Sequence, residues 1–174
     1  SATPSEDGLT WTVTLREGTT TLVVTDNLPN VMTVVSSRVM SIGANITGSL
    51  LAVGASGTPS DSNFADGLPD RVTFNFGTVV DSFTNAATTG DQIVVEVVAR
   101  VDENAINSDG DILTNTVTLD YATGTASDTA SVEVTEPVLI IQKASPVVTG
   151  RPNDIIDYTI TVTHAPTSTG PAYD

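Results

Sequence analysis

The chain has no cysteine, which excludes disulfide cross-links, thiol catalysis and cysteine-ligated zinc sites. Basic residues are almost as scarce: Lys and Arg number 6 against 21 acidic residues, so the formal net charge is −15. So few cations cannot neutralise a row of phosphates, and we expect neither nucleic acid nor an anionic membrane surface as a partner. No apolar run reaches the roughly 18 residues of a membrane span, so we also expect no membrane insertion.

Catalytic signals are missing as well. The only histidine is His164, and the sequence contains no G-x-S-x-G turn or comparable motif that would supply a nucleophile for it to activate. Asp109 and Asp111 are closely spaced, but nothing in the sequence shapes a cleft around them, and solvated turn acids are the simpler interpretation. We therefore predict that the protein is not an enzyme and uses no cofactor, with calcium as the one candidate metal ion.

What the sequence does contain is alternation. Leu9, Trp11 and Val13 alternate with threonines, which predicts a strand with one buried face that includes the tryptophan. Ile156 to Val162 repeats this pattern, and no segment has a helical period. Valine and threonine suit a pleated, half-buried surface, so the expected fold is an all-β, Ig-like antiparallel β-sandwich. Further β-rich runs lie at 20–25, 31–40, 71–77, 91–101, 112–120, 129–135 and 138–143.

Turn residues divide these runs. The segments 54–70 and 84–91 are rich in Gly, Asn, Asp and Ser and are expected to be surface loops. Pro137 cannot donate to a central ladder, and a new apolar run follows it directly. We place a module boundary there, with an Ig-like module over 1–137 and a separate segment over 138–174.

An internal repeat supports the boundary. Residues 7–16 align with 154–163 at an offset of 147, which puts Trp11 on Tyr158. If the match is real, the run at 138–147 should have a counterpart before Ser1. We then expect one module of a tandem array, lacking its first strand and followed by the opening strands of the next. Two unrelated amphipathic strands are the alternative.

Several motifs carry a family resemblance, above all the TDNLP turn at 25–29, the LTNT strand at 113–116 and the QK…DYTITV pair. In this order the chain resembles a repeat family of bacterial and archaeal surface proteins, whose Ig-like sandwiches are related to isopeptide-forming domains of fimbrial proteins and adhesins. It departs at Asn30-Val31, where the family has a small residue and glycine, and at Asp157. The resemblance implies an extracellular spacer or stalk. The matching segments are 11–36, 71–80, 99–119, 137–164 and 171–174.

Two acidic loops are candidate calcium sites, because calcium takes carboxylate, amide and carbonyl oxygens from irregular backbone. Neither loop has the EF-hand spacing, and an ordinary turn rich in Asx residues is the alternative for each. The first loop contains Asp61, Asn63 and Asp66, and the second contains Asp102, Asn104, Asn107, Asp109 and Asp111.

A cross-link is a further hypothesis. Asn115 has the strand parity of Val117, and Lys143, the only lysine, has that of Ile141, so both are expected to face an apolar interior. A buried lysine and asparagine beside an acid are the reactants of an isopeptide bond. Glu96 is the one acid we can offer; it shares the parity of Val94 and Val98, but the solvent face is the expected place for its charge.

The repeat argues against a bond within one chain, because Asn115 belongs to the first module and Lys143 opens the second. A hydrogen-bonded structural amide is the plainer interpretation of Asn115. Alternatively, the strand at 138–143 adds to the preceding sandwich or to a neighbouring copy, as in donor-strand complementation.

The preferred function is an extracellular structural repeat of a cell-surface adhesin, stalk or fibre, with neighbouring copies or adjacent modules of the same protein as partners. The alternative is a surface module that binds calcium or carbohydrate through the 54–70 and 102–111 loops. Asn45 begins a glycosylation sequon, a pattern frequent by chance.

Overall fold

The computed structural model describes residues 9–62, 66–82, 87–102, 108–147 and 149–168, and these residues confirm the all-β prediction. Eleven strands form antiparallel sheets that pack as sandwich-like layers, and among the described residues the helical structure is one 3₁₀ turn, Thr89–Asp91. The described chain divides into two compact units. The first holds 9–102 and 112–132, and the second holds 108–111 and 133–168, so the contact boundary lies four residues before Pro137.

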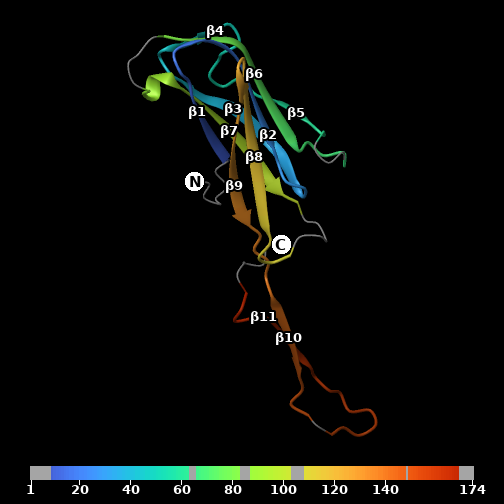
Figure 1. Cartoon of the computed structure of the whole chain (residues 1–174). Coiled ribbons are helices and arrows are strands. Elements are labelled where there is room, and N and C mark those ends of the chain that lie inside the picture. The colour runs from blue at the N-terminus through green and yellow to red at the C-terminus, as the bar shows by residue number, and fades with distance from the viewer. Residues whose placement is uncertain (1–8, 63–65, 83–86, 103–107, 148, 169–174) are drawn as a thin grey trace. The chain divides into compact units, whose positions relative to one another are not determined.

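The first unit is a two-sheet sandwich (Figure 1). One sheet has the order β1-β7-β3, and the other has the order β4-β6-β2-β8-β9, with β5 pairing to β6. The strands of the first sheet are β1 (Leu9–Thr14), β7 (Gln92–Val101) and β3 (Met32–Ile42). Those of the second are β4 (Ile46–Gly48), β5 (Thr58–Ser60), β6 (Arg71–Asp81), β2 (Gly18–Asn27), β8 (Ile112–Tyr121) and β9 (Gly124–Glu133).

The core lies between these sheets and follows the alternation of the sequence. Leu22 and Val24 of β2 and Val95 of β7 are fully buried, and in β1 the threonines that alternate with Trp11 and Val13 are exposed. Phe74 and Phe76 of β6 join the same core, with ring centroids 6.2 Å apart. Trp11 is only 8% exposed, as its strand parity predicts.

Two backbone details show where turn chemistry shapes the sandwich. A Cβ on Gly43 would lie 2.1 Å from the carbonyl oxygen of Gly90, so only glycine lets these two turns meet. Val31 has φ +73°, a region that β-branched residues rarely adopt.

Some boundaries differ from the predictions. The segment 54–70, expected to be a loop, contains the short strand β5, which pairs with β6. β9 begins at Gly124 rather than at 129, because its small polar residues carry no apolar alternation but still pair with β8. The last predicted strand begins at Thr159 rather than at 156.

The second unit contains the hairpin of β10 (Leu139–Ala144) and β11 (Thr159–His164). The two strands pair antiparallel, with Lys143 opposite Ile160 and Ile141 opposite Val162. Every residue of both strands is exposed. The predicted strands are therefore present, but among the described residues no second sheet covers them.

Candidate functional site

The two lateral sides of the sandwich differ. On one side the outer edge of β3 is occupied, because the Val39 amide donates to the Ala55 carbonyl and the Gly54 amide donates to the Val39 carbonyl, each at 2.8 Å. On the other side β1 and β9 are the last strands of their sheets, and no described residue pairs with their outer edges. The sandwich is thus covered on one side and open on the other.

A groove of about 670 Å³ lies along this open side. Leu9, Trp11 and Val13 of β1 form one wall, and residues 126–131 of β9 form the other. Thr114 and Ser131 share a hydrogen bond at 2.9 Å on the outer face of β8 and β9, so Ala126, Asp128 and Ala130 take the inward parity. Ala126 and Asp128 are nevertheless exposed, because the groove separates them from β1.

A buried polar cluster lies next to Trp11 of β1. The indole nitrogen of Trp11 donates to Oδ2 of Asp26 at 3.2 Å, and Asp26 is only 1% exposed. Burial raises the pKa of Asp26 to about 6, while the contacts with Trp11 and with Asn115 oppose that rise. Sequence reasoning missed Asp26, although its even parity with Leu22 and Val24 on β2 was a readable signal.

Asn115 is 2% exposed, so its predicted inward orientation is confirmed. Its side chain neighbours Asp26, but neither its Nδ2 nor its Oδ1 meets a partner at hydrogen-bond geometry, and Oδ1 of Asp26 is unpartnered too. Buried polar atoms without partners cost roughly 1 to 3 kcal/mol each. Asp26 is the polar group that this buried amide faces, and its contact with Asn115 lowers the pKa of the carboxyl.

The two other cross-link candidates lie elsewhere. Glu96 is on the outer face of β7, where it pairs with Arg38 at 2.7 Å, so the acid facing Asn115 is Asp26 and not Glu96. Lys143 lies on the exposed β10, not in an apolar interior, and its Nζ sits 4.1 Å from the centroid of the Tyr158 ring. Asn115 and Lys143 belong to the two separate units, each described by itself.

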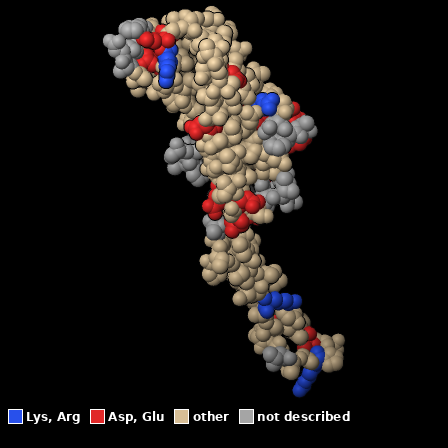
Figure 2. All heavy atoms as spheres, viewed as in Figure 1, with Lys and Arg blue, Asp and Glu red and all other residues tan. Residues whose placement is uncertain are grey.

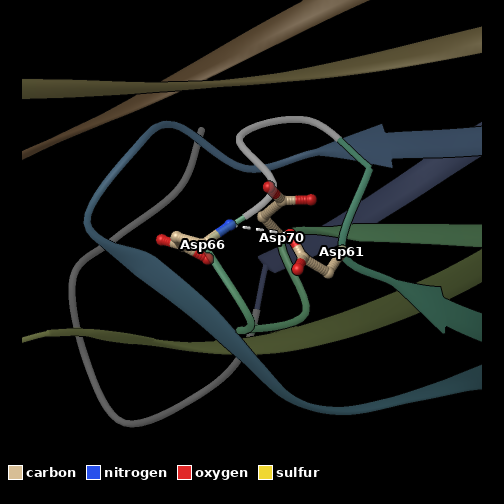
Figure 3. Close-up of side chains that lie close together, drawn as sticks. All are labelled: Asp61, Asp66 and Asp70. Carbon is tan, nitrogen blue, oxygen red and sulfur yellow. Dashed lines mark hydrogen bonds between the residues drawn. The ribbon is translucent and has the colours of Figure 1, made fainter.

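The first calcium loop brings three acids together. Carboxylate oxygens of Asp61, Asp66 and Asp70 lie within 4.8 Å of one another (Figure 3). Asp70 was not predicted, and Asn63 lies outside the described residues. The Asp61 carboxylate already accepts hydrogen bonds from the backbone amides of Asp66 at 3.1 Å and Gly67 at 2.7 Å. These two hydrogen bonds close the turn.

The second calcium loop is divided between the two units. Asp102 accepts hydrogen bonds from Thr33 and Arg100 in the first unit. In the second unit, Asp109 accepts the Glu136 amide at 3.0 Å and Asp111 accepts the Ser108 amide at 2.8 Å. Asn104 and Asn107 lie outside the described residues. The described acids of this loop act in turns, and none belongs to a three-carboxylate group.

Two further buried acids are Asp81, the last residue of β6, and Asp91, which directly precedes β7. Asp81 is 5% exposed, and burial together with the nearby charge of Asp91 raises its pKa. Asp91 also accepts the Asn45 side-chain amide at 2.7 Å. This hydrogen bond uses the nitrogen that a glycan would need, so the sequon residue Asn45 has a structural role in the folded unit.

Charge is sparse on the protein surface. Uncharged side chains cover most of the face shown in Figure 2, with carboxylates in small groups and few basic residues. Within the described residues, no helix is long and apolar enough to cross a membrane. No family model, curated protein or solved structure matches this chain. Its function is therefore argued from its own residues and their geometry.

Proposed function

We propose that the chain is an extracellular structural repeat, a spacer and assembly module of a surface stalk or fibre that joins neighbouring copies or adjacent modules of the same protein. One observation carries the proposal. The alternation of β1 recurs in the β10–β11 hairpin, where Ile141, Ile160 and Val162 are 71%, 61% and 59% exposed.

Such a hairpin is incomplete by itself. A two-stranded hairpin is marginally stable in water, and contiguous exposed apolar side chains mark interaction surfaces. Both sides of this hairpin carry aliphatic residues, since Ile140 is exposed as well as Leu139 and Ile141. A module whose last strands need a neighbour, beside a sandwich with an open side, has the properties of a link in an array.

The composition supports the same role. A net charge of −15 limits non-specific association, and the absence of cysteine removes any dependence on redox conditions. Among the described residues the groove contains no histidine, cysteine or paired acids to act on a substrate, since Asp128 is the one ionisable residue of that set that lines it. These features support a mechanical role over catalysis.

The location can be tested on intact cells of the source organism with antibodies raised against the sandwich. We expect labelling of intact cells or of fibres released from them, and loss of that labelling after brief protease treatment of the cells. Antibodies against a cytosolic protein provide the control. Signal confined to the lysate would overturn the proposed function.

Calcium binding at Asp61, Asp66 and Asp70 is the second candidate function, favoured by the approach of their three carboxylates to within 4.8 Å. If this loop binds calcium, the melting temperature falls on adding EDTA and Asp66→Asn removes the difference, because three carboxylates repel without a cation. Asp128→Asn, an exposed acid on β9, is the matched control. An unchanged melting temperature in EDTA rules the site out. The carbohydrate version of this alternative has no comparable observation among the described residues.

A further inference from the structure

Two acids from different sheets meet at one end of the sandwich core. Asp81 ends β6 and has the inward parity of Val79, while Asp91 lies two residues before the buried Ile93 of β7. Both acids are buried, and a side-chain hydrogen bond joins them. Two ionised carboxylates offer no donor, so this hydrogen bond needs a proton on one of the two acids.

The contacts of Asp91 show which acid carries the proton. Its Oδ1 accepts from the Asn45 side-chain amide at 2.7 Å, and its Oδ2 accepts from the amide and the hydroxyl of Thr88 at 2.7 and 3.0 Å. An ionised carboxylate has about four acceptor positions, so one remains for the hydroxyl of a protonated Asp81. Oδ1 of Asp81 is buried without a partner, which costs less for a neutral acid than for a carboxylate.

The acid pair lies where the chain crosses between the two sheets. The Leu15 amide, just after β1, donates to the Asp91 carbonyl at 2.8 Å. Asn45, just before β4, donates its backbone amide to the Gly90 carbonyl at 3.0 Å and accepts the Ser82 amide at 2.9 Å. The turn after β1, the turn before β4 and the segment from β6 to β7 therefore meet at the end of the sandwich that carries β4 (Figure 1).

We propose that Asp81 and Asp91 share one proton and form a pH-sensitive latch that fastens these three segments together. The latch is closed in acid. As the pH rises, the shared proton leaves for solvent, and two buried carboxylates in contact then repel each other. Because Asp91 is held by its donors, we expect the end of β6 to move, and the Ser82 amide next to Asp81 to lose its hydrogen bond first. This device acts within one sandwich and goes beyond the proposed assembly role.

The surroundings of Asp81 set the direction of the switch. Burial, then the charge of Asp91 and the hydrogen bond with it, raise the pKa of Asp81 above its ordinary 3.8. The stabilising effect of the proton is therefore fully present below about pH 4 and is lost as the pH rises through the folded-state pKa. Glu17, in the turn after β1, raises this pKa further, and its neighbour Arg16 is exposed. The sequences of β4 and of 82–90 contain no ionisable residue, so neither segment supplies a cation in place of the proton.

Carbon-13 NMR of the carboxyl groups of the full chain, recorded from pH 3 to pH 8, tests the shared proton. The Asp81 carboxyl should titrate at a higher pH than an aspartate in an unfolded peptide. The Asp91 signal should shift in the same step, because a shared proton belongs to the pair. Asp81→Asn should remove this step from the Asp91 signal. Asp128→Asn, which alters an exposed acid on β9, is the matched control and should leave the step unchanged.

Amide hydrogen exchange tests the latch itself. Protection of the Ser82 and Leu15 amides, measured relative to the Val95 amide in the centre of β7, should fall at least about fivefold between pH 5 and pH 8 in the wild type. In Asp81→Asn the same ratio should change less than about twofold, because the asparagine stays neutral and can donate to Asp91 at every pH. The matched control should follow the wild type.

Three results would overturn the proposal. One is an Asp81 carboxyl that titrates as in an unfolded peptide or independently of Asp91. Another is relative protection that falls equally in the wild type and in Asp81→Asn. The third is a melting temperature at pH 7 that EDTA lowers in the wild type but not in Asp81→Asn, because a bound cation rather than a proton would then join the acids. If Asp81→Asn does not fold, the wild-type titration decides alone.

Discussion

β1 and β11 share one alternating pattern and have opposite surroundings. Trp11 and Val13 are 8% and 7% exposed, whereas Tyr158 and Ile160, their counterparts in the repeat, are 56% and 61% exposed. Both strands alternate apolar residues with threonine, and both pair antiparallel with a neighbour. The difference is that β1 faces a second sheet and β11 does not. An alternating sequence therefore selects the face to be buried, but a packing partner is needed to bury it.

The most direct way to break this comparison is to truncate the equivalent aromatic residues. Trp11→Ala should lower the free energy of unfolding by about 3 to 5 kcal/mol, because it removes a large buried side chain and leaves a cavity. Tyr158→Ala should change it by less than about 0.5 kcal/mol, as for other exposed positions. Urea unfolding of dilute full chain, followed by far-ultraviolet dichroism, measures both. Equal losses would contradict the stated difference in burial.

A smaller effect concerns Asp26, the buried acid that accepts a hydrogen bond from Trp11 of β1. Burial raises the pKa of Asp26 from 3.8 to about 6, so between these values the folded state holds a proton that the unfolded state has lost. This group contributes a destabilisation that is absent at low pH, grows as the pH rises from about 4 and is complete above about 6. Its full size is about 3 kcal/mol.

Asp26→Asn should therefore be more stable than the wild type at pH 7 by up to about 3 kcal/mol, with little difference at pH 4. The asparagine oxygen can still accept the hydrogen bond from Trp11. Urea unfolding at several pH values measures the difference between the two proteins. Taking that difference removes the contribution of Asp81, whose raised pKa acts in the same direction in both. A difference that does not change with pH would contradict the burial of an ionisable Asp26.

The smallest effect sharpens the comparison from the exposed side. Lys143→Ala removes the ammonium over the Tyr158 ring, a contact worth about 0.5 to 1 kcal/mol at an exposed site. Amide exchange in β10 and β11 should become about twofold to fivefold faster, while amides of β2 and β7 are unaffected. Lys143→Arg keeps the cation and is the control. Faster exchange in the sandwich would show that Lys143 supports more than its own hairpin.

How much of the fold could be predicted follows from these same residues. Parity along one strand was enough to bury Trp11 and Asn115, because a strand alternates its faces whatever it packs against. β9 was foreseen only in part, since Gly124 to Thr129 contain no apolar side chain larger than that of alanine. Ala126 is the one apolar side chain there and too small to mark an alternation, so this part of the strand depends on backbone pairing with β8, which composition does not encode.

The candidate site shows the same division. Asp61 and Asp66 are five residues apart, and their approach could be foreseen, whereas the addition of Asp70 depends on how the loop folds back. Glu96 was the acid offered for Asn115, but Asp26 from another strand faces it. Contacts across a sheet depend on strand order, which no single strand specifies.

The sequence by itself determined the class of fold, the inward face of each apolar strand and the acidic, cysteine-free surface, because these follow from periodicity and composition. Tertiary structure decided which acid meets Asn115, which side of the sandwich is open and which of the two alternating strands is buried. These features depend on residues far apart in the chain, and only the order and packing of the sheets brings such residues together.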